Sequence, residues 1–307
     1  MVSVLMPVFN RERSIGVALE SILGQTHQDV EAVVVDDGST DGTPEVVRRY
    51  ARKDGRIRLV LHDRNRRTPA ALNTAAAEAK GQWITFLDSD DWLFPDSIEL
   101  RLATARAEGV HVVNSDGLVW HQGAVEPVPW NTTGPVSGRA YSRLLRAPGT
   151  TLYFLMSRTA LECFGKFDER IVTYQDWDLG IRLAKHFQFR WIDQAMFVWD
   201  QRAKDTISSN DLRGARGYEQ VFRKHSLAIL LRLGPRALAR HYHFVSELYT
   251  QAGAGADARR CKTLGRLICP RPDRAVGRLA RKLRSASGRE TREGCFDPDE
   301  VRQQESA

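Results

Sequence analysis

The sequence has little cysteine and no long apolar run, and each absence excludes a class of protein. Its four cysteines, Cys163, Cys261, Cys269 and Cys295, show no CxxC spacing, so the sequence indicates neither a zinc site nor a disulfide framework. No stretch approaches the roughly 18 to 20 consecutive apolar residues that cross a bilayer. The apolar start VSVLMPVF has no basic residues before it and no small-residue cleavage site after it, so we expect it to belong to the fold. These features predict a cytoplasmic protein.

Glycine motifs that bind phosphate are also missing. The chain contains neither GxGxxG nor GxxxxGK followed by Ser or Thr, which argues against a classical dinucleotide-binding fold and a P-loop enzyme. Its 307 residues are 42% hydrophobic and 27% charged, which is the composition of a globular protein with one large or two small domains.

The net charge of +7 is concentrated near the C-terminus. Residues 1–255 hold 32 Lys and Arg against 30 Asp and Glu, whereas residues 256–294 hold 12 against 4. An anionic partner is therefore expected only for the C-terminal stretch. There, AVGRLARKLRSA has an apolar and a basic helical face, a candidate for binding an anionic membrane surface, with a solvated tail as the alternative. No aromatic residues are interleaved for base stacking, so we expect no nucleic-acid partner.

Strand and helix patterns alternate over the first 90 residues. Apolar runs rich in β-branched residues predict buried strands over residues 2–9, 30–35, 57–62 and 83–88. Three helices are predicted between them, the first stopping at Gly24 and the others opening with Thr43 and Thr68 as N-caps before a proline. The alternation is typical of βαβ units, so the sequence predicts an α/β fold with an open, mostly parallel, Rossmann-like sheet flanked by helices.

Acidic residues gather where these strands end, which is where open α/β sheets bind ligands. Asp36 and Asp37 follow the second strand, where a carboxylate accepts hydrogen bonds from a ribose or a base; an acidic turn that caps the next helix is the competing interpretation. Asp88, Asp90 and Asp91 follow the fourth strand within four residues. Carboxylates packed this closely repel one another unless a divalent cation lies between them, so a Mg²⁺ or Mn²⁺ diphosphate fits, although many acidic loops are merely solvated.

Four segments, in their order and separation, resemble one family. SVLMPVFN, VVVDDGSTDGT, ALNTAAAEAKGQWITFLDSDD and QDWDLGIRLA look like the large family 2 of inverting glycosyltransferases, which have the GT-A fold and use nucleotide-diphosphate sugars. The resemblance covers roughly residues 1–200. It implies Mn²⁺ or Mg²⁺ as cofactor, a UDP-linked donor, and a hydroxyl acceptor on a glycan or lipid. It also implies polysaccharide biosynthesis for the cell envelope, in the cytoplasm or at the inner face of the membrane.

The resemblance also assigns roles to single residues. It implies that Pro7 and Phe9 line the pocket for the nucleotide base and that Asp37 reads the base. Asp88 then faces the ribose, and Asp90 holds the metal, as the two acidic ends of a DxD motif.

Asp176, in YQDWDL, matches the family's acceptor-activating carboxylate. Inverting transfer needs one base on the face opposite the leaving diphosphate, and it needs no second acid when a metal stabilises that phosphate. An N-cap for the helix that follows is the competing interpretation. The family often has an acidic pair where this chain has Gln175 and Asp176.

The sequence indicates less clearly which basic residues would contact the diphosphate. The family often shows an aromatic-Arg-x-His segment where this chain reads VWDQRAKDTISSN, so the His is missing and Arg202 or Lys204 are candidates to replace it. Three arginines also follow the third strand, and of these we take Arg67 as the candidate.

From about residue 110 the regular alternation of strand and helix patterns ends. After about residue 210 an antiparallel helix pair is predicted over 218–233 and 236–253. We therefore expect a catalytic domain over 1–205 (nucleotide-binding half 1–109, acceptor half 110–205), a helical extension over 206–270 and a basic flexible tail over 271–307. Two other functions stay open, a nucleotidyltransferase and a non-catalytic sugar-nucleotide or polysaccharide-binding protein with a degenerate site.

Overall fold

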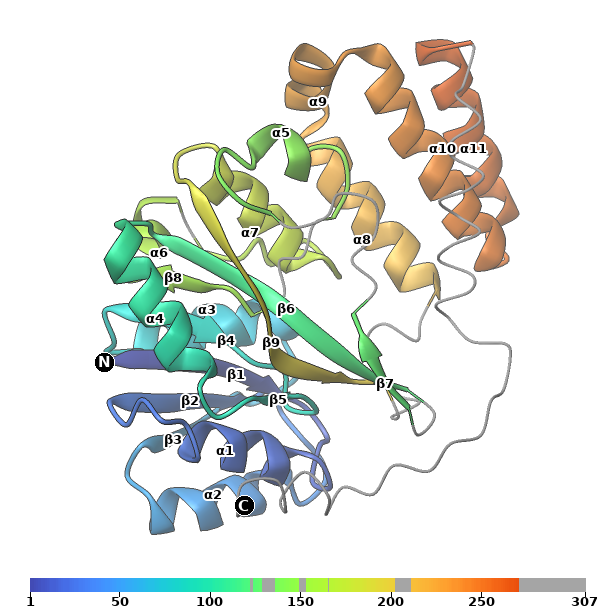
Figure 1. Ribbon diagram of the computed structural model, residues 1–307. Coiled ribbons are helices and arrows are strands. Elements are labelled where there is room, and N and C mark those ends of the chain that lie inside the picture. The colour runs from blue at the N-terminus through green and yellow to red at the C-terminus, as the bar shows by residue number, and fades with distance from the viewer. Residues whose placement is uncertain (122–123, 129–135, 149–152, 165, 202–210, 271–307) are drawn as a thin grey trace.

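A mixed nine-stranded sheet with helices on both faces forms the centre of the protein (Figure 1). The computed structural model describes residues 1–121, 124–128, 136–148, 153–164, 166–201 and 211–270. The predicted fold class is confirmed: an α/β sheet comes first and a helical segment follows it. In the part of the chain that is described, no helix is both long and apolar enough to span a membrane.

Four parallel strands in the order β3-β2-β1-β4 make up the first part of the sheet. They are β1 (Val2–Val8), β2 (Val30–Asp36), β3 (Ile57–Leu61) and β4 (Trp83–Phe86), joined by α1 (Ile15–Leu23), α2 (Thr43–Lys53) and α3 (Thr68–Glu78). Every residue of β1 and β2 is buried, as expected for parallel strands covered on both faces. The carboxyl ends of β1, β2 and β4 therefore meet at one sheet edge.

Two predicted helix starts differ from the structure by one residue. Gly42 and Arg67, rather than Thr43 and Thr68, occupy the N-cap positions of α2 and α3. The Thr43 hydroxyl is engaged elsewhere, since it donates to Asp41 at 2.5 Å and accepts from the Arg11 N–H at 2.8 Å. Tertiary contacts thus override the local capping preference.

The sheet continues beyond β4 with strands of mixed direction. β8 (Leu155–Ser157) pairs antiparallel with β4, and β6 (Val112–His121), β9 (Phe189–Asp200) and β5 (Trp92–Leu93) follow in that order. β7 (Ala124–Pro127) pairs with β6 alone, and α4 (Ser97–Glu108) and α6 (Arg158–Phe164) complete this part. The change of pattern noted near residue 110 corresponds to the start of β6, which forms with β9 the long ribbon that crosses the middle of Figure 1.

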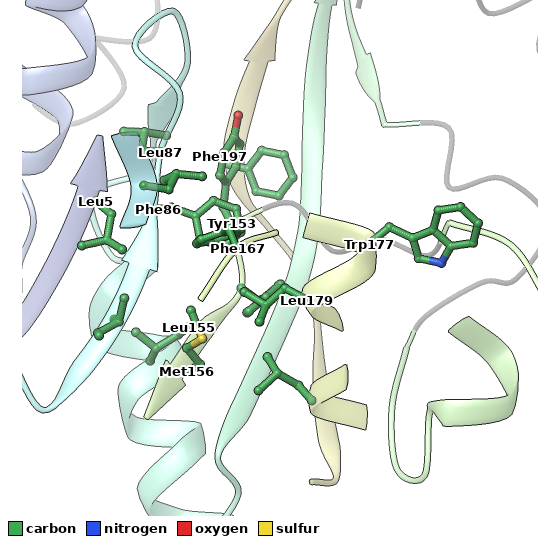
Figure 2. Close-up of a cluster of buried hydrophobic side chains, with 14 of the residues drawn as sticks. Leu5, Phe86, Leu87, Tyr153, Leu155, Met156, Phe167, Trp177, Leu179 and Phe197 are labelled. Atoms are coloured by element: carbon green, nitrogen blue, oxygen red, sulfur yellow. The ribbon is translucent and has the colours of Figure 1, made fainter. Parts of the chain in front are cut away.

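Aromatic side chains fasten the two parts of the sheet together. The ring of Phe86 in β4 packs edge-on against Tyr153, Phe154 and Phe167, with centroids 5.2 to 6.1 Å apart. Tyr153 in turn packs edge-on against Phe197 of β9 at 4.9 Å. Figure 2 shows this cluster reaching from Leu5 and Phe86 across to α7. Tyr153 is thereby fixed in the core, beside the loop that follows β4.

A group of four helices follows the sheet and packs against α7 (Gln175–Ala184) and the short α5 (Tyr141–Leu144). The four are α8 (Asp211–Lys224), α9 (Ser226–Leu233), α10 (Pro235–Gln251) and α11 (Gly255–Ile268). The second predicted helix corresponds to α10, but the first is divided at His225 into α8 and α9, and α11 was not predicted. Buried polar contacts join the group: the Tyr218 hydroxyl lies 2.9 Å from His241 Nδ1, and Trp177 Nε1 donates to the Leu144 carbonyl at 2.7 Å.

Two glycines of α8 offer a matched test of how this helix supports α7. A Cβ on Gly217 would lie 2.8 Å from the Thr173 carbonyl oxygen, whereas a Cβ on Gly214 would meet nothing within 4 Å. We expect Gly217→Ala to lower the free energy of unfolding by about 1 to 3 kcal/mol because backbone must move. Gly214→Ala should instead raise it by about 0.4 to 1 kcal/mol. Urea unfolding of both variants checks this, and equal effects would contradict the close approach of α8 to Thr173.

Candidate active site

The loops after β1 and β2 are bound to each other, which gives the sheet edge a fixed shape. Asn10 Oδ1 accepts from the Thr40 N–H at 2.8 Å, and the Asn10 N–H donates to Ser39 Oγ at 2.9 Å. The Glu12 carboxylate accepts from the Gly42 N–H at 3.1 Å. The DDGSTDGT segment is therefore held by the segment that follows β1, and its carboxylates are pre-positioned.

Asp37 is buried and oriented by two donors. Its Oδ1 accepts from His62 Nδ1 at 2.6 Å and from the Arg66 N–H at 2.9 Å. His62 Nε2 lies 2.9 Å from Thr74 Oγ1, so the imidazole is itself held on both sides. Gly38 has φ +77°, and a Cβ there would approach the Arg64 backbone to 2.7 Å, so only glycine fits this turn. His62 was not predicted as a site residue, although its place at the end of the third predicted strand is a usable signal.

Pro7, Phe9 and Arg67 lie around the same edge. Pro7 is buried within β1, while Phe9, just past the strand, is 40% exposed and offers a ring face. Arg67 is exposed at the start of α3 with φ 75°. Burial and the charge of Arg67 lower the pKa of Arg213, so the two cations lie near each other across α3 and α8.

The three carboxylates after β4 differ in their surroundings. β4 ends at Phe86, so Asp88 lies just beyond the strand rather than at its last position. Asp90 Oδ2 accepts from Arg11 Nε at 3.3 Å. Asp91 is buried, accepts from the Tyr153 hydroxyl and also accepts from the Asp200 N–H at 2.7 Å. Asp91 therefore belongs to the protein interior, and Asp88 and Asp90 remain for the site.

The ionised forms of Asp88 and Asp90 are destabilised by their surroundings. Burial, together with the negative charges of Asp90 and Asp176, raises the pKa of Asp88 to about 7. Burial also raises the pKa of Asp90, and the nearby Arg11 guanidinium opposes that rise. Arg11 is a second residue that the sequence did not reveal, because only the fold brings it next to Asp90. The arrangement favours binding of a cation or a proton.

Asp176 lies in the first turn of α7, and its negative charge helps to raise the pKa of Asp88. The N-cap of α7 is Tyr174, with φ 63°, so the alternative that Asp176 caps this helix is wrong. A carboxylate in the first turn is stabilised by the helix dipole. The structure thus brings Asp88, Asp90 and Asp176 from distant parts of the sequence to one place.

Asp178, two residues further on, is fully buried and anchors α7. Its carboxylate accepts from His225 Nε2 at 2.8 Å, Arg182 Nε at 2.9 Å and Lys224 Nζ at 2.9 Å. Burial alone would raise the pKa of Asp178, but these partners outweigh it and lower the pKa to about 2. The helix that carries Asp176 is therefore fixed by a side chain that is ionised at neutral pH.

No group of three or more His, Cys, Asp or Glu side chains within the described ranges forms a complete metal site by itself. A cation at this edge would need ligands from outside the protein, such as diphosphate oxygens and water. Arg202 and Lys204, the predicted replacements for the missing His, lie outside the described residues.

Comparisons with solved structures match the fold. S. aureus TarS in complex with UDP-GlcNAc shares 18% identity with a TM-score of 0.58, over 87% of this chain and 91% of that one. Mannosyltransferase PcManGT from Pyrobaculum calidifontis, in complex with GDP-Man and Mn²⁺, shares 22% identity with a TM-score of 0.57, over 93% and 85% of the two chains. The GT-A fold predicted from the sequence is confirmed by these likenesses.

Sequence relatives carry the assignment further. An uncharacterized glycosyltransferase of Rickettsia felis is 45% identical over 202 residues, 64% of this chain and 32% of that protein. One of Haemophilus influenzae is 38% identical over 102 residues, 33% of this chain and 41% of that protein. The match therefore spans less than half the length of either relative. The family model for glycosyl transferase family 2 matches residues 3–167, more than half of the chain, and the chain belongs to that family.

Proposed function

We propose that this protein transfers a sugar, with inversion, from a UDP-linked donor to a hydroxyl of a glycan or lipid-linked acceptor, with the help of a divalent cation. The observation that carries the proposal is the coupling of three carboxylates at one sheet edge, where the charges of Asp90 and Asp176 both act on Asp88. Groups suited to a donor diphosphate and to an acceptor hydroxyl thereby face the same small region.

The donor is assigned to the carboxyl ends of β1, β2 and β4. The exposed ring of Phe9, backed by Pro7 in the strand, offers a stacking surface for the base. Asp37, oriented by His62, accepts from the base. Both TarS and PcManGT are described with nucleotide-diphosphate ligands, UDP-GlcNAc and GDP-Man, which supports this donor class.

Asp88 is assigned to the ribose and Arg67 to the diphosphate. Asp88 is coupled to Asp90 and lies beside the strand end, so the ribose and the cation would be neighbours. Arg67 is exposed at the N-cap of α3, a helix whose first turn holds no acidic residue, and an exposed guanidinium in such a place suits a phosphate group.

Asp90 and Asp88 fit a divalent cation. Burial raises the pKa of both, joined by repulsion from Asp90 and Asp176 at Asp88 and from Asp200 at Asp90, and a cation bound between them would offset these costs. We do not assign Asp91 as a ligand, because it is buried and each of its oxygens accepts a hydrogen bond, whereas Asp88 and Asp90 are partly exposed. Mn²⁺ or Mg²⁺, when bound, would stabilise negative charge on the leaving diphosphate. The Mn²⁺ described with PcManGT supports the choice.

Asp176 is assigned as the base. Its carboxylate takes the proton of the acceptor hydroxyl as that oxygen attacks the anomeric carbon. The pairing of Asp178 with His225 and Lys224 holds α7, so Asp176 keeps its position relative to Asp88 while the reaction proceeds. Transfer to the acceptor hydroxyl needs no second carboxylate acid.

The assignment of regions follows from these roles. We assign residues 1–109 to donor binding, 110–205 to acceptor binding and 206–270 to a helical extension that supports α7. The tail over 271–307 lies outside the described residues, and we keep it as a candidate for contact with an anionic membrane. A location in the cytoplasm, at the inner face of the membrane, and a role in polysaccharide synthesis for the cell envelope complete the proposal.

The first prediction from the proposed function concerns Asp88 and pH. Because its pKa is about 7 in the folded protein against 3.8 ordinarily, ionised Asp88 destabilises the ligand-free fold at pH 8, and this cost shrinks as the pH falls below 7. Asp88→Asn removes the charge. We expect it to stabilise the protein more at pH 8 than at pH 5, by on the order of 2 kcal/mol. Urea unfolding at both values measures this, with exposed Asp63→Asn as control, and an equal gain at both values would refute it.

The second prediction concerns the cation. Asp90→Ala should abolish Mn²⁺-dependent binding of UDP because it removes a metal ligand, and it should leave the fold intact. Isothermal titration with UDP, with and without Mn²⁺, measures the effect. Asp63→Ala, which removes an exposed carboxylate near the same edge, is the control and should bind as wild-type protein does. Unchanged Mn²⁺-dependent affinity in Asp90→Ala would exclude the metal role.

The third prediction concerns the base. Asp176→Asn should keep donor binding but slow sugar transfer by about 10²- to 10⁴-fold, the range for loss of a positioned general base. Transfer rates and UDP affinity are measured side by side. Asp178→Asn serves as the contrast, since it should lower the melting temperature by breaking the anchor of α7. Transfer at the wild-type rate by Asp176→Asn would reject the assignment, and no transfer by wild-type protein with any donor would favour a binding protein.

A further inference from the structure

The helix α9 exposes three leucines on one side. Leu227, Leu230 and Leu231 are 66%, 39% and 76% exposed. Their spacing of three and four residues places them on the same helix face. Ile229, on the opposite side, is fully buried, so α9 is packed firmly against the protein. Neighbouring leucines presented to solvent by a well-packed helix mark an interaction surface.

Two stretches without acidic residues surround these leucines. Residues 220–246 contain five Lys and Arg and no Asp or Glu, and residues 136–148 contain three Arg and no Asp or Glu. The fold brings part of each stretch together, because α5 lies beside α9 (Figure 1) and the Arg232 guanidinium lies over the ring of Tyr141, 5.6 Å from its centroid. The surface near α9 is therefore both apolar and basic.

The arginines of this surface differ from the cations at the end of α8. Arg223 pairs with Glu219, and Lys224 pairs with Asp168 and Asp178, so those charges are balanced within the protein. Arg146, Arg232 and Arg236 are exposed. We define the α9 patch by six residues: Leu227, Leu230, Leu231, Arg146, Arg232 and Arg236.

We propose that the α9 patch binds an anionic lipid surface. The leucines would enter the boundary between headgroups and acyl chains, and the arginines would contact the lipid phosphates through paired N–H donors. A second copy of this chain fits the patch less well, since a two-fold contact would place the same arginines opposite one another. The inference rests on the location at the membrane given under the proposed function and deepens it, because it names the surface that makes the contact, and it does not depend on residues 271–307.

Sedimentation of the full chain with vesicles tests the proposal. One set of vesicles is phosphatidylcholine alone, and the other contains phosphatidylglycerol as well. We expect binding to the anionic set only, and a loss of more than about tenfold in the variant that combines Leu227→Gln, Leu230→Gln and Leu231→Gln. Combined Arg232→Gln and Arg236→Gln should weaken binding by about fivefold for each charge removed at low salt.

Two controls test whether the α9 patch itself makes the contact with lipid. Val17→Gln changes an apolar residue that is 52% exposed on α1, at the opposite end of the molecule, and should bind as wild-type protein does (Figure 1). A chain ending at residue 270 should retain most of the binding. Thermal melting of every variant reports on folding, and if the leucine variant melts lower, the arginine variant decides the result.

Several results would overturn the proposal. Equal pelleting of wild-type protein and both patch variants would do so, and so would absence of binding to anionic vesicles. Complete loss of binding on removal of residues 271–307 would assign the contact to the tail instead. A dimer of the wild-type protein that the leucine variant abolishes, seen by sedimentation velocity without vesicle binding, would assign the patch to a second copy. Donor binding by Asp90→Ala and transfer by Asp176→Asn report on the site independently.

Discussion

The buried carboxylate of Asp91 is the contact on which the acidic edge depends. Burial raises its pKa well above the ordinary value, and the Tyr153 hydroxyl and the Asp200 N–H compensate its loss of water. These two donors come from the segments of β8 and β9, so one side chain ties the loop after β4 to the other half of the sheet. Asp88 and Asp90 are held at the surface of the site because Asp91 is held in the interior.

A buried structural carboxylate beside a carboxylate of the candidate site also occurs on α7. Asp176 and Asp178 are two residues apart, so they project to opposite sides of the helix. Asp178 is buried among Arg182, Lys224 and His225, whereas Asp176 acts on the charge state of Asp88. Each acidic motif thus contains one carboxylate that fixes the backbone and at least one that we assign to the proposed site. The aromatic cluster around Tyr153 connects both motifs to one core.

The sequence predicted the parallel strands and the edge at which the site lies, because buried strands and their acidic ends are local patterns. It did not distinguish Asp91 from Asp88 and Asp90, since Asp91 alone of the three accepts from the Asp200 N–H, which is 109 residues away in sequence. The partners His62 and Arg11 were missed for the same reason: the Arg11–Asp90 contact spans 79 residues. The helix start at Thr43 was misplaced because a tertiary contact with Arg11 took its hydroxyl.

Continuous pairing runs through the sheet from β3 to β5, including the antiparallel junction of β4 with β8. Two lobes joined by a linker can swing about a hinge, but here such a swing would break sheet hydrogen bonds and separate Phe86 from Tyr153. The sheet around the carboxylates therefore forms one continuous unit rather than two lobes that hinge. If the proposed function holds, side chains and loops set on that sheet make the choice between substrates, and a hinged closure of two lobes does not.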